Sequence, residues 1–271
     1  GIQGFDSTHM VSKVTKYSKR LMNPKNTLFE LEKTYQISME GRPGPVWLDI
    51  PIDIQGTTIP NANKLKIFKS KKINKLNLKK NELIKISKMI EQSKRPVFWF
   101  GNGIKLSKSE IIVEKVLKKY PFPSFVSWAG IDLLKSNHHL NYGRPGVYGN
   151  RASNFILQNA DLIISVGTRM SIPMIGYVHN EFARNAKIIQ VDIDKTEINK
   201  LKKKTNLGIN NDANVFLKNI LVGIKNNINK KLLNHWLHYC KNTLKKYPHI
   251  ELKAHSDKNG FINSYKFLDK F

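Results

Sequence analysis

The sequence predicts an α/β protein with a mostly parallel sheet. Short apolar runs alternate with segments of helical periodicity from about residue 81 to 225, and glycine or a polar residue follows each apolar run. Strands that alternate with helices favour a parallel sheet that is covered on both faces. At 271 residues, the chain has room for one large domain or two modest ones.

The N-terminal part predicts a helix that is followed at once by a buried strand. Thr27 and Glu30 have the spacing of a capping box at a helix start, and apolar residues recur at helical spacing as far as Met39. Gly41 predicts the end of this helix, because glycine adopts the left-handed conformation at low steric cost. The even positions of 46–50 are aliphatic, which predicts a strand buried between two layers.

The segment 56–80 is poor in large apolar side chains and predicts a surface linker. Beyond it, the expected helices cover 82–92, 107–120, 151–159 and 212–224, and the expected strands cover 97–100, 122–128, 162–166 and 187–193. Ser107 and Glu110 form a second predicted capping box, and Asp212 is the expected N-cap of the last helix.

The charge of the chain raises the question of its partners. A net charge of +26 arises from 46 basic and 20 acidic residues, which is typical of proteins that bind nucleic acid or anionic membranes. Arginine is scarce, however, and the lysines are scattered among asparagines without interleaved aromatic residues. We interpret the charge as mainly solvated surface and keep nucleic-acid binding as the minor alternative.

The composition also indicates the cellular compartment. No apolar run approaches the ~20 residues needed to cross a bilayer, and the N-terminus carries no signal-peptide pattern. Cys240 is the single cysteine, which excludes an internal disulfide and a site built from several cysteines of one chain. We therefore expect a cytoplasmic protein that does not bind membranes.

Four loops follow predicted strands and are expected to meet at the carboxyl edge of the sheet, where open α/β sheets bind ligands. Their glycines allow the backbone to approach a phosphate, their arginines supply charge, and an acid at a strand end can hold a ribose hydroxyl. Each loop alone is more often an ordinary turn, but together they predict a nucleotide-binding crevice. The loops are Gly101-Asn102-Gly103, Gly143-Arg144-Pro145-Gly146, Gly167-Thr168-Arg169 and Asp192-Ile193-Asp194.

The chain resembles the thiamine-diphosphate-dependent enzymes of the acetolactate synthase group. The resemblance covers most of the chain and is strongest at 41–55 and 160–198. It rests on four stretches in the same order: GRPGPVWLDIPIDIQ, KRPVFWFGNG, NADLIISVGTRM and AKIIQVDIDKTEI.

This resemblance implies a domain organisation. The central domain is expected to be Rossmann-like, and the C-terminal part of a second α/β domain, which binds the pyrimidine of the cofactor, precedes it. The start of a diphosphate-binding domain is expected at the C-terminal end. The implied boundaries are 1–55 for the pyrimidine-binding part, 56–80 for the linker, 81–225 for the central domain, 226–258 for a connection and 259–271 for the diphosphate-binding part.

The resemblance also implies a function. Enzymes of this group decarboxylate a 2-oxo acid and join the product to an acceptor, using thiamine diphosphate and Mg²⁺ in the full-length enzyme, which we expect to be a homodimer or homotetramer. Their activating glutamate lies upstream of the position of Gly1, and their metal motif Gly-Asp-Gly occurs nowhere in this sequence. We therefore expect a fragment that is inactive as an isolated chain.

Individual residues are carried over by the same resemblance. Gln3 and Lys16 match positions near the active site and are the candidate catalytic residues. The candidate cofactor-binding residues lie where flavin-binding members hold FAD: Trp128, Ala129, Gly143, Arg144, Gly146, Gly167, Thr168, Arg169, Asp192, Ile193, Asp194 and Asp212.

This chain departs from the flavin binders at two positions. Ser171-Ile172-Pro173 stands where acidic residues usually follow the arginine, and Gly143-Arg144-Pro145-Gly146 lacks the usual histidine. FAD, another adenine nucleotide and no nucleotide therefore all stay open. Two further alternatives are a self-standing Rossmann-like nucleotide-binding module that uses the same loops and, less favoured, a lysine-rich nucleic-acid-binding protein.

Overall fold

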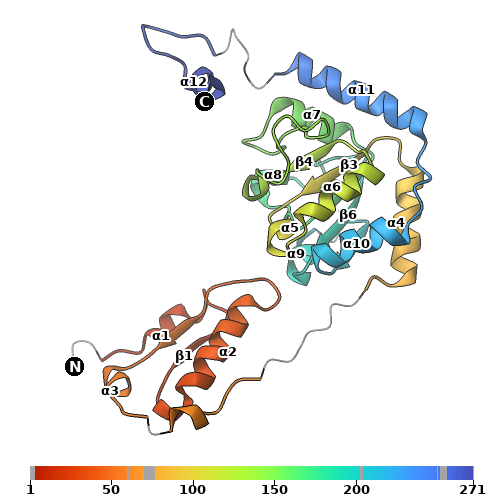
Figure 1. Ribbon diagram of the computed structural model, residues 1–271. Coiled ribbons are helices and arrows are strands. Elements are labelled where there is room, and N and C mark those ends of the chain that lie inside the picture. The colour runs from red at the N-terminus through yellow and green to blue at the C-terminus, as the bar shows by residue number, and fades with distance from the viewer. Residues whose placement is uncertain are drawn as a thin grey trace. The chain divides into compact units, whose positions relative to one another are not determined.

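The computed structural model describes residues 4–59, 61–69, 77–201, 204–248, 250 and 255–270. The chain divides into two compact units, Gly1–Asn74 and Lys75–Phe271, and Figure 1 shows the elements of each. None of the described helices is long and apolar enough to cross a bilayer.

The first unit has a two-stranded parallel sheet, in which β1 (Ser18–Arg20) pairs with β2 (Trp47–Asp49). An ion pair of 2.8 Å joins the Arg20 guanidinium to the Asp49 carboxylate across the two strands. Leu21 is the one hydrophobic residue that is buried among the described residues of this unit. The remaining elements are α1 (Ser7–Val11), η1 (Pro24–Asn26), α2 (Thr27–Met39), α3 (Ile52–Gln55) and η2 (Ala62–Lys64).

The structure corrects two predictions in the first unit. Thr27 is the first residue of α2 and not its cap, and its hydroxyl donates a hydrogen bond to the Pro24 carbonyl at 2.6 Å. Glu30 instead accepts a hydrogen bond of 2.7 Å from the Tyr17 hydroxyl. Strand β2 is not buried between two layers, since Trp47 is 43% exposed. The predicted left-handed conformation of Gly41 is confirmed by its φ of +60°.

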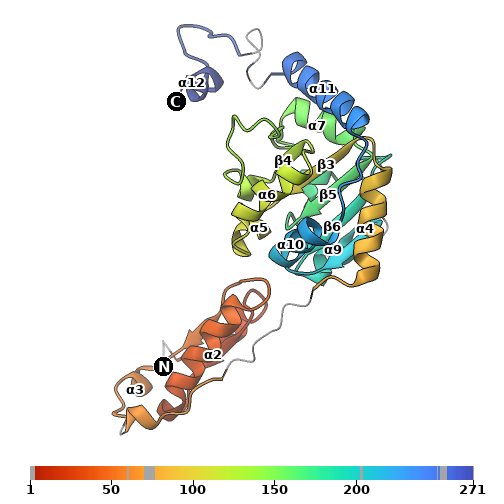
Figure 2. The same cartoon turned by 45° about the vertical axis from the view of Figure 1, so that its right-hand side comes forward.

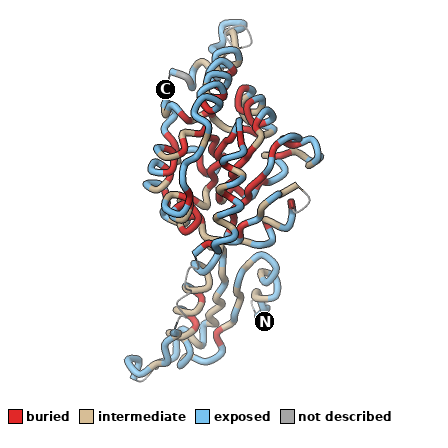
Figure 3. Tube along the Cα trace, turned by 90° about the vertical axis from the view of Figure 1, so that its right-hand side faces the viewer, coloured by how far each residue is buried: buried red, intermediate tan, exposed pale blue. Residues whose placement is uncertain are grey.

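The second unit contains a five-stranded, all-parallel sheet in the order β4-β3-β5-β6-β7. The predicted α/β class with a mostly parallel, Rossmann-like sheet is thus confirmed. Strands β3 and β5 are buried along their whole length. Figure 3 shows most of the buried residues in this unit, and they come from its helices as well as its strands. The strands are β3 (Pro96–Phe100), β4 (Ser124–Val126), β5 (Leu162–Val166), β6 (Lys187–Asp192) and β7 (Leu207–Asn210).

Helices cover both faces of this sheet. The right-handed connections between parallel strands place α6 (Glu110–Lys119) on one face and α7 (Arg151–Asn159) and α9 (Lys195–Lys200) on the other. Helix α10 (Ala213–Gly223) packs beside α6 and α4 (Lys80–Gln92), and Figures 1 and 2 show these helices side by side.

Helix α11 (Lys230–Lys246) packs against α7, and the indole N–H of Trp236 donates to the Pro96 carbonyl at 3.0 Å. The remaining short elements are α5 (Gly103–Leu106), η3 (Trp128–Gly130), α8 (Ile172–Ile175) and α12 (Ser264–Lys270).

Most of the predicted elements of this unit are present, with three corrections. The second predicted capping box is wrong, because α6 begins at Glu110 after Ser109, and the Ser107 hydroxyl lies 2.7 Å from that of Ser109. The strand predicted at 122–128 is limited to Ser124–Val126. Strand β7 and helix α9 were not predicted, because both are short and each has a single buried residue.

The loops after β3 and β5 touch through their backbones. The Gly101 N–H donates to the Val166 carbonyl at 3.0 Å, and the Gly103 N–H donates to the Gly167 carbonyl at 3.1 Å. A Cβ atom on Gly101 would lie 2.2 Å from the Gly167 oxygen, and one on Gly167, whose φ is +63°, would lie 2.7 Å from the Gly103 Cα. These glycines are therefore required by the contact between the two loops.

Gly101→Ala is expected to lower the free energy of unfolding by about 3 kcal/mol, because backbone atoms cannot yield to the added methyl group. Gly223→Ala is the control, since this glycine ends α10 and the added carbon would meet only the flexible Leu83 side chain, at 3.2 Å. It should change the free energy of unfolding by about 1 kcal/mol or less. Urea unfolding monitored by tryptophan fluorescence measures the free energy of unfolding of both variants. If Gly101→Ala loses no more stability than the control, the loop contact is contradicted.

Candidate functional site

The sheet order creates a switch point between β3 and β5. From β3 the chain passes to β4 on one side, whereas β5, β6 and β7 extend on the other side. At such a point, the loops that follow the two central strands diverge to opposite faces, and ligands of open α/β sheets bind outside the carboxyl ends of the strands there. The candidate residues follow these carboxyl ends, so the structure brings their loops to one edge of the sheet.

Two aromatic rings are exposed at this edge. Trp128 begins η3, directly after β4, where the Ser127 N–H donates to the Phe100 carbonyl at 2.9 Å. Its ring centroid lies 5.5 Å from that of Tyr148, and the two residues are 54% and 74% exposed. Exposed neighbouring rings can stack on a planar ligand. Tyr148 was not among the predicted site residues, and its contact with Trp128 depends on tertiary structure.

The loop that contains Arg144 is held by side chains of α7. The side-chain amide of Asn154 accepts from the Gly146 N–H at 2.8 Å and donates to the Gly146 carbonyl at 3.0 Å. The Arg144 N–H donates to the Asn150 side chain at 3.0 Å. In the described part of the chain, no hydrogen bond or ion pair of the Arg144 guanidinium is found, so this cation remains available to an anion.

The guanidinium of Arg169 is already paired. It contacts the Glu197 carboxylate at 3.1 Å, and Lys200 reaches the other oxygen of the same carboxylate at 2.8 Å. The Glu197 side chain is only 4% exposed, so two cations neutralise a buried carboxylate. Arg169 itself has a φ of +63°, an uncommon conformation for a residue with a side chain. Glu197 was not among the predicted site residues, because Arg169 is distant from it in the sequence.

The carboxylates of the three acids at this edge accept hydrogen bonds from backbone N–H groups. The Asp192 carboxylate accepts from the Asp194 N–H at 2.9 Å, and Asp194 caps α9 by accepting from the Thr196 N–H at 2.9 Å. Asp212 caps α10 by accepting from the Asn214 N–H at 2.9 Å, which confirms the N-cap predicted for this helix.

The other candidates occupy ordinary positions at the strand ends. Asn102 occupies the N-cap position of α5, which begins at Gly103. Ala129 lies within η3, and Ile193 is 41% exposed after β6. The Thr168 hydroxyl is 2.6 Å from that of Ser165. Gly143 has a φ of +86°, and a Cβ there would lie 2.5 Å from the Asn150 side chain.

The two candidate catalytic residues belong to the first unit. Gln3 lies outside the described residues. The Lys16 ammonium donates to the Arg42 carbonyl at 3.0 Å and also to the Glu40 carbonyl, so it binds the chain that follows α2. Across the described ranges, no group of three or more His, Cys, Asp or Glu residues is arranged to hold a metal ion.

The carboxyl edge thus offers two neighbouring exposed aromatic rings, glycine-containing loops and the Arg144 guanidinium, which has no partner in the described part of the chain. These groups can bind a planar, negatively charged molecule. The chemistry that these groups support is the binding of a ligand.

Comparison with known proteins places the chain in a family. The family described as "Thiamine pyrophosphate enzyme, central domain" matches residues 83–220, which contain all five strands of the larger sheet. This match confirms the resemblance to thiamine-diphosphate-dependent enzymes that the sequence motifs indicated.

Three curated relatives are large subunits of acetolactate synthase. Isozyme 1 of Escherichia coli K12 is 33% identical over 64% of this chain and 30% of its own length. The Cyanidium caldarium protein is 29% identical over 87% of this chain and 41% of its own length. The probable large subunit of Methanococcus aeolicus is 30% identical over 80% of this chain and 39% of its own length.

These matches therefore span 30% to 41% of the relatives' lengths. The family match covers half of the chain, and its residues form the parallel sheet and the loops at its carboxyl edge. On these grounds, the chain belongs to the thiamine pyrophosphate enzyme family and contains the central domain of that family.

Proposed function

We propose that this chain is part of a thiamine-diphosphate-dependent, acetolactate synthase-like enzyme that decarboxylates a 2-oxo acid and joins the product to an acceptor. The observation that carries the proposal is the extent of the similarity. The match to the Cyanidium caldarium large subunit runs over 242 residues, whereas the central-domain family accounts for 83–220. The similarity therefore extends beyond the nucleotide-binding type of sheet that many unrelated proteins share.

The proposed domains follow the same assignment. The first unit would be the C-terminal part of a pyrimidine-binding domain, and the second would contain the central domain. Leu21 alone is buried among the described hydrophobic residues of the first unit, and a two-stranded sheet is marginally stable by itself. Both observations support a role for the first unit as part of a larger domain. A cytoplasmic homodimer or homotetramer is the proposed state of the full-length enzyme.

The carboxyl edge of the central sheet is the proposed binding site of an adenine nucleotide, with FAD as the first candidate. The Arg144 guanidinium would bind a phosphate, and the exposed rings of Trp128 and Tyr148 would stack on a planar ring. Asp192 and Asp194 lie at the carboxyl end of β6 on the same edge, where an acid can hold a ribose hydroxyl. Flavin bound there would supply a planar redox group.

The residues of this chain do not fit thiamine diphosphate and Mg²⁺. The described residues contain no cluster of three or more His, Cys, Asp or Glu side chains that could hold a metal, and the Gly-Asp-Gly motif of the family does not occur in the sequence. No residue of this chain is therefore proposed to bind the metal or the diphosphate. In this proposal, the chain contributes nucleotide binding, and the bond-making chemistry belongs to other parts of a full-length enzyme.

Arg144→Ala is expected to weaken binding of FAD, or of ADP as its adenine half, by about 1–3 kcal/mol, because a hydrogen bond to a charged phosphate is lost. Arg184→Ala is the control: it removes the same charge from the chain, at an arginine that is paired with Glu181, and it should leave the affinity unchanged. Isothermal titration calorimetry measures both. Equal affinities of the two variants for FAD and for ADP would contradict the assignment of Arg144.

The purified chain is expected to consume no pyruvate when thiamine diphosphate and Mg²⁺ are supplied. The reason is that its sequence has no Gly-Asp-Gly motif that could hold the metal and the diphosphate of this cofactor. A coupled assay of CO₂ release, with and without EDTA, measures the activity. Turnover above background that EDTA abolishes would contradict the proposed division of roles.

A further inference from the structure

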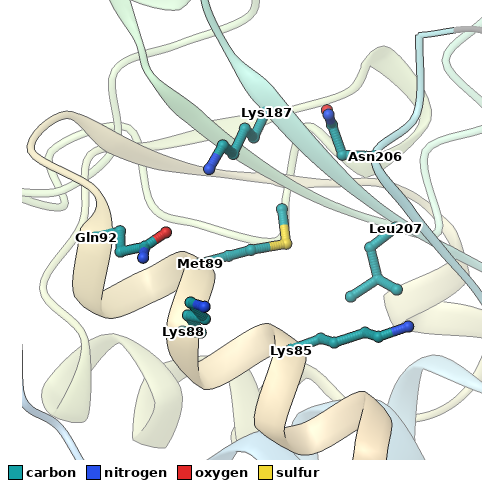
Figure 4. A pocket seen from close by; sticks show the side chains of 7 residues that line it. All are labelled: Lys85, Lys88, Met89, Gln92, Lys187, Asn206 and Leu207. Atoms are coloured by element: carbon teal, nitrogen blue, oxygen red, sulfur yellow. The ribbon is translucent and has the colours of Figure 1, made fainter.

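A second surface of the central domain has the character of a binding site. A hollow of about 450 Å³ lies between α4 and the amino ends of β6 and β7. Figure 4 shows Met89 pointing from α4 towards the strands and Leu207 pointing from β7 towards α4. Lys187 and Leu207 are the first residues of β6 and β7, so the hollow lies at the edge of the sheet opposite to the proposed nucleotide site.

The rim of this hollow is cationic. Lys85 and Lys88 come from α4, and Lys187 comes from β6. No acidic residue lines the hollow, and these three ammonium groups form no ion pair with any described residue. Other lysines of the unit are neutralised, as Lys105 is by Asp132 at 2.8 Å. Three unneutralised cations around one hollow favour a negatively charged ligand.

The hollow lacks the features that bind a small phosphate. Its lining contains no arginine, the side chain that binds phosphate in a bidentate manner, and no glycine. The nearby backbone is occupied, since the Lys187 N–H donates to Asp161 and the Ile188 N–H donates to the Asn206 side chain. A phosphate would therefore find flexible ammonium groups but no fixed N–H donors.

An acidic peptide fits the same features better. Met89 and Leu207 are partly buried against the core, and their remaining surface forms an apolar floor between the lysines. A peptide can place one apolar side chain on this floor and carboxylates against the rim, with the carboxylates determining orientation and rate of association. A second copy of this chain is disfavoured, because the chain carries a net charge of +26.

We propose that the hollow formed by Lys85, Lys88, Met89, Lys187 and Leu207 docks an acidic peptide segment of another protein, with one apolar side chain between Met89 and Leu207. The position of Leu207 on β7 supports an extended segment. Strand β7 is the last strand of the described sheet, so no described strand pairs with its outer side. The site is independent of nucleotide binding at the opposite edge.

The test uses the full 271-residue chain and a fluorescein-labelled peptide, Asp-Glu-Leu-Asp-Glu, in fluorescence anisotropy titrations at low salt. The charge-reversal variant K85E/K88E/K187E should bind the peptide about tenfold more weakly, because three rim charges change sign. The control variant K115E/K118E/K218E makes the same change of charge at exposed lysines of α6 and α10, and it should weaken binding less than about threefold by the long-range field alone. Circular dichroism of both variants checks that they are folded.

A second peptide tests the apolar floor. Replacing its leucine by serine should weaken binding to the wild-type chain about fivefold or more, since the buried apolar surface is lost. Equal losses in the two triple variants would overturn the proposal, and so would equal affinities for the two peptides. Inorganic pyrophosphate and duplex DNA are tested in the same way. If either binds more tightly than the leucine peptide and is equally sensitive to K85E/K88E/K187E, the hollow is a phosphate site and the proposal is overturned.

Discussion

The central domain depends on the close approach of two backbones at the switch point of its sheet. The loops after β3 and β5 are joined by hydrogen bonds from Gly101 and Gly103, and side chains on Gly101 or Gly167 would prevent the contact. This approach fixes the two central strands where the connections diverge to opposite faces. The loop with Arg169 follows β5, and the segments with Trp128 and Arg144 follow β4, the neighbour of β3, so this packing requirement helps to position the candidate site.

The fold was largely predictable where apolar periodicity is strong. The helix at Arg151–Asn159 and the strand at Leu162–Val166 have the predicted bounds, because each is determined by burial of consecutive or periodic apolar residues. Strand β7 could not be predicted, since it has one buried residue, Ile209, and gains its stability by pairing with β6. Both capping boxes failed for a related reason: the spacing S/T-x-x-E also occurs where the hydroxyl binds a different backbone group, as at Thr27.

The loops of the candidate site were predictable from the sequence, but the interactions between their side chains were not. The parallel order of the strands is enough to bring the carboxyl-edge residues to one side of the sheet. The pairing of Arg169 with the buried Glu197, and the ring contact of Trp128 with Tyr148, depend on contacts between distant segments. The glycines were interpreted as phosphate-binding, whereas Gly101 and Gly167 are required by contact between loops. The two edges of one sheet thus carry different chemistry, with a guanidinium and aromatic rings at one and three lysines at the other.

The central claim is that the carboxyl edge of this sheet binds an adenine nucleotide. Amide hydrogen exchange of the chain with and without FAD tests it directly, because exchange reports which backbone segments a ligand protects. The account predicts slower exchange in 127–130, 143–150 and 167–170, with no change in α4 or at the start of β7. Protection confined to α4 and β7, or no protection at saturating FAD, would contradict it.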